Sequence, residues 1–305
     1  MKHLEANTGL VYLKAVKNGI PQELRPAFAH CAKLTQDHYE NFPVASWLMP
    51  ADIRPHICSI YAFARTADDF ADEPGMGDEE RISRLEDWRR RLHDCADRPD
   101  GRIFEALAET IRQYQIPLSL FEALIDAFSQ DVRQSRHETF ADLLDYSTRS
   151  ANPVGRLILI LFGYKADDLL QQSDAICTAL QLTNFWQDIS VDYGRNRIYL
   201  PRQEMDRFGV TEDDLEKAVL TDGFRAMVGD LIERTRELFT KGKDLPENVR
   251  GRLKYELRLT WLGGAQILNE IEDVDCDIFR RRPALSKSTG CRLLWRSLRP
   301  VGTIH

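Results

Sequence analysis

The chain has 305 residues, of which 43% are hydrophobic, so it can bury a substantial core as one large domain or two smaller ones. Its net charge of −7 argues against general binding to nucleic acid. The first residues, MKHLEANTGL, lack an apolar signal segment, and no run of about 18 apolar residues occurs, which predicts a cytoplasmic protein without a membrane span. The cysteines are scattered without a CxxC pair, which favours reduced thiols over disulfides or a zinc site.

Helical patterns recur along the chain, separated mostly by prolines or glycines, whereas the alternating Val, Ile and Thr runs that mark strands are absent. In the first half, helices are expected at 26–38, 50–71, 78–95, 102–114, 118–134 and 139–150. In the second half they are expected at 153–162, 166–191, 202–208, 211–219, 224–241 and 247–271. The sequence therefore predicts an all-α fold.

Residues 61–73, YAFARTADDFADE, place a run of acids in an otherwise apolar, helix-forming stretch. Tyr61, Arg65, Asp68 and Asp72 recur at helical spacing, so they share one helix face. This set is called the first stripe. Read alone, it is as consistent with a solvated acidic cap before the loop at 74–77 as with a binding site.

A second stripe, Asn184, Asp188 and Asp192, lies in QLTNFWQDISVD, within a helix that is apolar on nearly all sides. An unpaired carboxylate there would be costly, so a partner is required, and a metal ion is a sufficient one. Both stripes fall near helix carboxyl ends, where the helix dipole disfavours carboxylates and a bound cation would reverse the penalty. Two such stripes facing each other would form a cage for hard divalent cations that bridge to phosphate oxygens.

Arg195 and Arg197 follow the second stripe directly. The planar guanidinium group donates paired hydrogen bonds to phosphate, so the combination favours a diphosphate over a structural calcium site. An ordinary basic surface loop is the alternative. Neither EF-hand spacing nor a GxxxxGK[ST] loop is present.

Three further features are ambiguous. His38, at a helix end, is more often structural than an acid or base. Gly155 favours close packing of an apolar helix, although a small residue facing a long lipid substrate would look the same. Beyond Asp277 the chain has no acid, and residues 278–305 form a basic tail with interleaved leucines and a tryptophan, which predicts a weak membrane-surface patch apart from a main domain at 1–277.

The segments YAFARTADDFADE and LTNFWQDISVDYGRNRIYLP resemble the two signature regions of the squalene/phytoene synthase family, and the likeness runs from about Gln36 to Leu268. The resemblance implies the isoprenoid-synthase fold, a single helical bundle with a central substrate cavity. It also implies that the two acidic regions coordinate Mg²⁺, two or three ions in the family, which bind a prenyl diphosphate.

By position, the resemblance implies the following roles. The metal ligands would be Asp68, Asp69, Asp72, Asn184, Asp188 and Asp192. The catalytic residues would be Asp68, Asp72, Asp188, Tyr61 and Arg65. The substrate contacts would be His38, Tyr39, Asn41, Phe42, Tyr61, Arg65, Gln187, Arg195, Arg197 and Tyr199.

Three positions depart from the family pattern. Members that condense two prenyl diphosphates usually carry an HSxSF-type segment, where this chain has HYENF at 38–42. An arginine usually precedes the middle aspartate of the second region, and here that residue is Gln187. A segment that usually reads AGxVG is Ala151-Asn152-Pro153-Val154-Gly155. These changes argue against ordinary head-to-head condensation.

The segments HYENFPVAS, ANPVGRLIL and LTNFWQD are similar to those of the bacterial branch of the family, which makes squalene for hopanoids in three steps. There one paralogue makes presqualene diphosphate, a second converts it with water to hydroxysqualene, and a flavoprotein reduces this alcohol. The resemblance implies the second step, with the other two proteins as partners. Because hydrocarbon products are insoluble, a peripheral position at the inner membrane is expected, with contact through the basic tail. Two alternatives stay open: a complete squalene or phytoene synthase, and a non-catalytic scaffold for the condensing paralogue.

Overall fold

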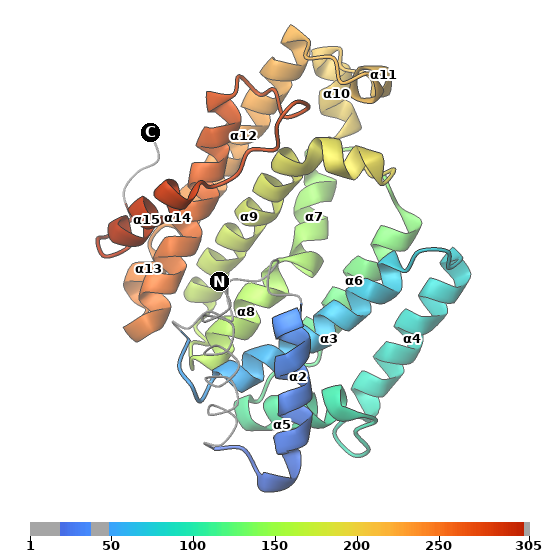
Figure 1. The fold of residues 1–305 in the computed structure, drawn as a ribbon, viewed down its shortest axis with the longest axis vertical. Helices are drawn as coiled ribbons and strands as arrows, with labels where there is room; N and C mark the ends of the chain where they lie inside the picture. Colours follow the sequence, from blue (N-terminus) through green and yellow to red (C-terminus); the bar gives the residue numbers. More distant parts are fainter. Residues whose placement is uncertain (1–18, 38–48, 302–305) are drawn as a thin grey trace. The chain divides into compact units, whose positions relative to one another are not determined.

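A computed structural model describes residues 19–37 and 49–301. Within these residues the regular structure is helical, apart from one isolated bridge between Arg136 and Ile198 (Figure 1). The predicted all-α class is therefore confirmed. The chain divides into two compact units, Met1–Arg133 with Leu157–Lys165, and Gln134–Arg156 with Ala166–His305.

The first unit is organised around α3, which packs against α2, α4, α5 and α6. Its helices are η1 (Gln22–Leu24), α2 (Arg25–Asp37), α3 (Arg54–Asp72), α4 (Asp78–Asp94), α5 (Arg102–Tyr114) and α6 (Ser119–Arg133). Phe28, Cys31, Cys58, Ala62 and Ala106 form a fully buried cluster where α2, α3 and α5 meet. Removing such apolar surface from water is the main favourable contribution to folding.

A buried polar network lies where α3 packs against α5. His56 is 2% exposed, and its Nδ1 lies 2.9 Å from Thr110 Oγ1. Thr110 Oγ1 also lies 2.8 Å from the carbonyl of Ala106 and 2.8 Å from Ser59 Oγ, so the three side chains form one hydrogen-bonded network. Ser59 Oγ donates to the carbonyl of His56 at 2.8 Å. Burial lowers the pKa of His56 to about 4, while Glu109 and then Asp52 act in the opposite direction, so the imidazole is neutral in the folded chain.

The second unit is organised around α9, which contacts α7, α11, α12, α13 and α14. Its helices are α7 (Phe140–Ser150), α9 (Asp167–Gly194), α10 (Arg202–Phe208), α11 (Glu212–Glu216), α12 (Asp222–Gly242), α13 (Leu245–Asn248), α14 (Gly251–Asp273) and α15 (Lys287–Arg296). The unit boundary falls inside α8 (Asn152–Leu161). Trp186 of α9 is fully buried and donates from Nε1 to Thr235 Oγ1 of α12 at 2.9 Å.

Ten of the expected helices agree with the structure to within a few residues, and two ranges need correction. The helix expected at 247–271 is broken, because Val249 is extended and Gly251 has φ +66°. The helix expected at 211–219 ends at Glu216, since Ala218 takes the left-handed conformation. In addition, α15 lies in the tail, where no helix was predicted.

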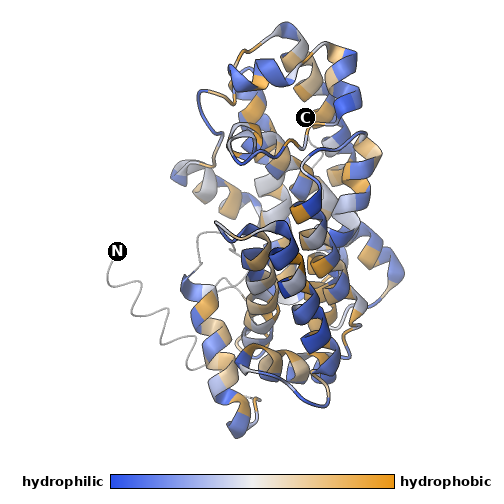
Figure 2. Ribbon diagram, turned by 90° about the vertical axis from the view of Figure 1, so that its right-hand side faces the viewer, coloured by the Kyte–Doolittle hydropathy of each residue, from blue (hydrophilic) through white to orange (hydrophobic). Residues whose placement is uncertain are grey.

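Figure 2 shows hydrophobic and hydrophilic residues interspersed along the helices, as expected for helices that bury one face and expose the other. None of the helices in the described residues has the length and the apolar composition that crossing a bilayer requires.

Gly155 is a packing residue. A Cβ atom there would lie 2.4 Å from Ser173 Oγ and 2.5 Å from Cys177 Sγ, both on α9. The hydrogen bond from Thr178 Oγ1 to Asn152 Oδ1, 2.9 Å long, holds the same two helices together. Close packing of α8 on α9 is therefore sufficient to explain this glycine.

Gly155→Ala is expected to destabilise the protein by about 1–3 kcal/mol, because the added methyl group overpacks the α8–α9 contact. Gly229→Ala is the matched control, since a Cβ at Gly229, in the middle of α12, meets nothing within 4 Å. That change should stabilise by up to about 1 kcal/mol through helix propensity. Urea unfolding followed by circular dichroism measures both, and equal midpoints for the two variants would contradict the packing argument.

His56 should make stability depend on pH. Between about 6.5 and about 4 the unfolded chain binds a proton at this imidazole that the folded chain does not, so stability falls as the pH falls through that window. One such group contributes a slope of up to about 1.4 kcal/mol per pH unit. His56→Gln should remove that part of the slope in urea titrations, whereas His93→Gln, at an exposed position on α4, should retain it.

Candidate active site

The first stripe lies on the last turns of α3, as predicted. Arg65 Nη1 donates to Asp68 Oδ2 at 3.0 Å, and Arg65 Nη2 lies 2.6 Å from Asp69 Oδ1. Tyr61 is buried, and burial raises its pKa, so the phenol is neutral. The guanidinium group therefore neutralises two carboxylates at the carboxyl end of a helix, where they would otherwise oppose the dipole.

The second stripe lies on the last turns of α9, also as predicted. Asn184 is exposed, contrary to the expectation that it is buried with Asp188. Asp188 is mostly buried and forms a two-pronged ion pair with Arg282: Nε donates to Oδ1, and Nη2 donates to Oδ2 at 3.0 Å. The partner that the sequence required for this carboxylate is thus an arginine from the basic tail.

Asp192 is the acid of the second stripe whose pKa is raised. Burial, followed by the neighbouring Asp188 carboxylate, raises its pKa to about 6, and Arg197, Arg195 and Arg282 oppose this effect. Two carboxylates and an amide on one helix face are the hard oxygen donors that Mg²⁺ prefers, and a divalent cation would relieve the repulsion between the acids. The donor set fits the ion that the family resemblance implies.

A tight turn brings Arg197 back to the end of α9. Asn196 takes the left-handed conformation at φ +59°, which asparagine tolerates better than most residues. The amides of Arg195 and Arg197 both donate to the carbonyl of Asp192 at 2.9 Å. Arg197 is therefore fixed beside the second stripe by backbone hydrogen bonds.

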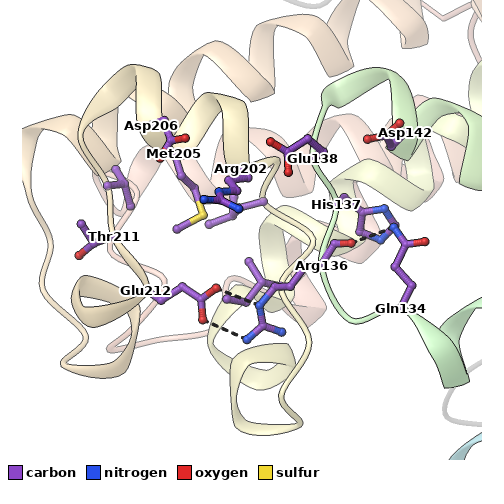
Figure 3. Close-up of a pocket in the computed structure, with 13 residues that line it drawn as sticks. Gln134, Arg136, His137, Glu138, Asp142, Arg202, Met205, Asp206, Thr211 and Glu212 are labelled. Carbon is purple, nitrogen blue, oxygen red and sulfur yellow. Dashed lines mark hydrogen bonds and ion pairs between the residues drawn. The ribbon is translucent and has the colours of Figure 1, made fainter.

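Arg136 holds this turn from a distant part of the chain, and its role was not foreseen from the sequence. It donates to the carbonyl of Asn196 at 2.8 Å and forms a paired ion contact with Glu212 at 3.0 and 3.1 Å (Figure 3). The amide of Ile198 also donates to the carbonyl of Ser135 at 2.9 Å. No local pattern marks Arg136, because its partners lie 60 and 76 residues away.

Tyr199 lies at the end of the same turn. Its ring stacks on Phe185 of α9 with centroids 3.7 Å apart and planes 10° apart, and His137 stacks on it at 5.5 Å. The ring is thereby fixed about one helical turn from Asp188 and about two turns from Asp192 along α9. This aromatic cluster therefore adjoins the second stripe and fixes the position of Tyr199 beside it.

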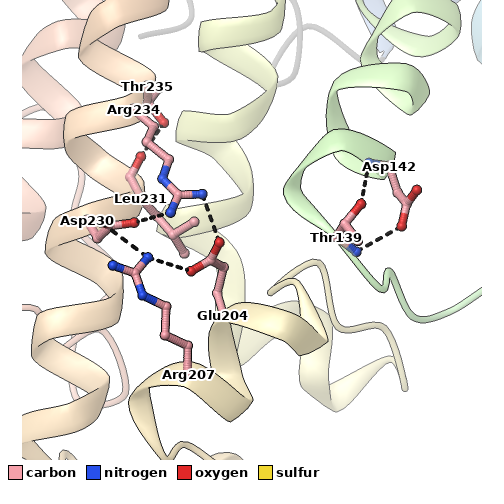
Figure 4. Close-up of polar contacts among 8 residues, drawn as sticks. All are labelled: Thr139, Asp142, Glu204, Arg207, Asp230, Leu231, Arg234 and Thr235. Carbon is pink, nitrogen blue, oxygen red and sulfur yellow. Dashed lines mark hydrogen bonds and ion pairs between the residues drawn. The ribbon is translucent and has the colours of Figure 1, made fainter.

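An ion cluster secures α10, which follows Tyr199. The buried carboxylate of Glu204 accepts from Arg234 at 2.8 Å and from Arg207 at 3.2 Å, and Asp230 lies 2.8 Å from Arg234 (Figure 4). Glu204 belongs to α10, and Arg234 and Asp230 belong to α12. The loop at 195–201 is therefore anchored at both ends.

A pocket of about 720 Å³ is lined in part by Ile198 and Leu200 of this loop (Figure 3). Its lining includes Arg136, His137, Glu138, Arg202 and Glu212. None of the predicted metal ligands or substrate contacts lines it. Because Arg136 is already paired with Glu212, we assign these charges to holding the loop and not to the predicted site.

Other predicted residues stand as follows. Gln187 donates from Nε2 to the carbonyl of Pro283 at 2.6 Å, so it holds the tail segment next to Arg282. His38, Tyr39, Asn41 and Phe42 lie outside the described residues.

Within the described residues, no three histidine, cysteine, aspartate or glutamate side chains are arranged to hold a metal ion as they stand. The two stripes belong to different units, and a cage made of both stays a prediction.

Comparison with known proteins identifies the family. The model of the squalene/phytoene synthase family matches residues 35–289, so the chain belongs to this family, whose members are prenyltransferase-type enzymes of isoprenoid biosynthesis. The chain is 29% identical to 15-cis-phytoene synthase from Synechococcus elongatus, over 85% of this chain and 88% of that protein. It is 35% identical to hydroxysqualene synthase from Zymomonas mobilis, over 66% of this chain and 68% of that protein.

The fold agrees with this membership. The crystal structure of squalene synthase HpnC from Alicyclobacillus acidocaldarius matches with a TM-score of 0.81 and 39% identity, over 87% of this chain and 98% of that chain. The expected isoprenoid-synthase fold is therefore confirmed.

Arg282 should compete with a cation for Asp188. In Arg282→Gln the competing charge is gone, so we expect Mg²⁺ to bind about fivefold more tightly, the factor that corresponds to about 1 kcal/mol of ion-pair energy. Calorimetric titration of the substrate-free protein with MgCl₂ measures this without any turnover. Arg280→Gln is the control, because Arg280 is paired with Asp277. Unchanged or weaker binding by Arg282→Gln would refute the competition.

Proposed function

We propose that this chain is a hydroxysqualene synthase, which converts presqualene diphosphate and water to hydroxysqualene and diphosphate. In this reaction the carbon–oxygen bond to the diphosphate breaks, the cyclopropylcarbinyl cation rearranges, and water adds to the cation and releases a proton. The enzyme would thus be a carbon–oxygen lyase within a family of prenyltransferase-type enzymes.

The observation that carries the proposal concerns the departures from the family pattern. Gln187, where an arginine is usual, is committed to the carbonyl of Pro283, and Asn152 of the ANPVG segment is committed to Thr178. Neither side chain offers a positive charge to a second diphosphate group. A site with one diphosphate pocket suits a substrate that is already condensed. The 35% identity to a hydroxysqualene synthase supports the same choice.

The roles of the residues follow from their chemistry. Asp68, Asp72, Asn184, Asp188 and Asp192 would hold Mg²⁺, with Asp69 beside them. When bound, the ions supply positive charge that stabilises the departing diphosphate. Arg65 and Arg197 would donate hydrogen bonds to the same oxygens, with Tyr61 and Arg195 near them.

The organic cation requires a different surface. The Tyr199 ring, held between Phe185 and His137, would form part of an apolar wall that excludes bulk water from the cation. Excluding all but one water is what separates capture as an alcohol from uncontrolled side reactions. The product is an alcohol without a new carbon–hydrogen bond, so this step needs no reductant.

The partners follow from the substrate and product. A prenyl-condensing paralogue would supply presqualene diphosphate, and a reductase, expected to be a flavoprotein, would consume hydroxysqualene. Because both molecules are poorly soluble, we place the protein in the cytoplasm with peripheral contact at the inner membrane.

A complete squalene or phytoene synthase is the second candidate, favoured by the 29% identity to a phytoene synthase over 85% of the chain. Such an enzyme would act on farnesyl or geranylgeranyl diphosphate directly. A non-catalytic scaffold is disfavoured, since it would have no need of acids whose burial and mutual repulsion are costly.

The test is product analysis by mass spectrometry after supplying presqualene diphosphate and Mg²⁺ without reductant. We expect hydroxysqualene as the product, and little product from farnesyl diphosphate alone. Squalene or phytoene formed from farnesyl or geranylgeranyl diphosphate would establish the second candidate. Absence of Mg²⁺-dependent binding of any prenyl diphosphate in calorimetry would revive the scaffold.

Asp68→Asn and Asp188→Asn should each lower turnover of presqualene diphosphate by at least about 100-fold at saturating Mg²⁺, because each removes a charge that holds the cations. Asp168→Asn is the matched control on α9, since that carboxylate is exposed in the first turn. Full activity in either stripe variant would exclude the proposed site.

A further inference from the structure

The basic tail contains one helix, α15, and this stretch of the chain carries positive charge without any acid. Residues 278–299 contain no acid, and their basic residues are Arg280, Arg281, Arg282, Lys287, Arg292, Arg296 and Arg299. Helix α15 occupies the second half of this stretch, and its N-cap is Ser286, whose Oγ accepts from the amide of Thr289 at 3.1 Å. The tail therefore contains a capped helix.

One face of α15 is fixed to the rest of the second unit. Thr289, Leu293 and Ser297 are buried, and their spacing of four residues places them on one side. Helix α15 packs on α14 (Figure 1), and Arg258 of α14 donates to the carbonyl of Ser297 at 3.2 Å. The orientation of the helix is thereby set, so the opposite face is held outward.

That outward face is apolar. Leu294 is 47% exposed, Trp295 68% and Leu298 62%, and Leu285 just before the helix is 39% exposed. Among the described residues only Val191, Val219 and Tyr255 are further large hydrophobics of this exposure. Four of seven such side chains thus fall within one short stretch, and Trp295 is the most exposed of all. Such clustering marks an interaction surface.

The apolar side chains are flanked by cations on one side. Arg292, Arg296 and Arg299 follow at spacings of four and three residues, so they form a stripe beside Trp295 and Leu298. The Arg299 guanidinium lies 5.4 Å from the Trp295 ring centroid. A tryptophan and leucines beside arginines form the pattern of helices that lie in the headgroup layer of a bilayer.

We propose that the surface formed by Leu285, Leu294, Trp295, Leu298, Arg292, Arg296 and Arg299 docks the protein on a bilayer that contains anionic phospholipid. The apolar side chains would enter the acyl boundary, and the arginines would contact lipid phosphates. A second copy of the chain is a poorer occupant, because it would bring the same cations together. The proposal does not depend on which prenyl diphosphate the enzyme uses.

The test is cosedimentation of the full chain with vesicles of phosphatidylcholine alone or with about one third phosphatidylglycerol. We expect binding to the anionic vesicles that is at least about tenfold tighter than to the neutral ones and that is lost in high salt. Trp295→Ser with Leu298→Ser, and separately Arg292→Gln with Arg296→Gln and Arg299→Gln, should each weaken binding by about tenfold or more.

Two controls accompany these variants. Val219→Ser removes an exposed apolar side chain elsewhere, and Arg84→Gln with Arg90→Gln and Arg112→Gln removes three exposed cations from α4 and α5; both should bind as the parent does. Thermal unfolding confirms that each variant is folded. Equal binding by tail and control variants, or no binding to anionic vesicles, overturns the proposal. If light scattering shows that the parent chain is a dimer and that only the tail variants are monomers, the surface is a protein interface instead.

Discussion

Carboxylates at the carboxyl end of a buried helix need positive charge beside them, and this constraint shapes both halves of the candidate site. On α3, Arg65 supplies that charge to Asp68 and Asp69 from the same helix. On α9, Arg282 supplies it to Asp188 from the tail. These acids are therefore paired with positive charge before any cation arrives, and the arginines that pair with them are groups that a diphosphate would attract.

The contact between Asp188 and Arg282 also explains why the tail lies where it does. Gln187 is hydrogen-bonded to Pro283, and Asp188 is paired with Arg282. One turn of α9 therefore fixes the segment that leads to α15. A residue that departs from the family pattern thus has a structural role. On this basis, α9 and the tail segment that leads to α15 are fixed to each other.

Helix positions and the two stripes could be predicted from the sequence, because both depend on spacing within one helix. The 61, 65, 68 and 72 positions share a face wherever a helix forms, and the apolar neighbours of Asp188 favour helix and burial. The break at 249–251 was missed because it depends on a left-handed glycine inside an otherwise helical pattern. Helix α15 was missed because its charged composition masks a short buried face.

Partners distant in sequence could not be predicted. Arg282 lies 94 residues from Asp188, and Arg136 lies 76 from Glu212, so no periodicity links them. The sequence required a positive partner for Asp188; the structure supplies Arg282, and the metal ion at this carboxylate stays a prediction. The tertiary fold decides which cation pairs with a given carboxylate, and the chain has 41 lysines and arginines that could have been the partner.

The cysteines give the α15 surface a practical property. Cys291 is exposed, Cys177 is partly exposed, and the other four are buried. Burial also raises the pKa of the Cys177 thiol to about 12, which suppresses the reactive thiolate there. A maleimide reagent should therefore modify Cys291 first, which lets a fluorophore or spin label be attached beside Trp295 in the unaltered protein.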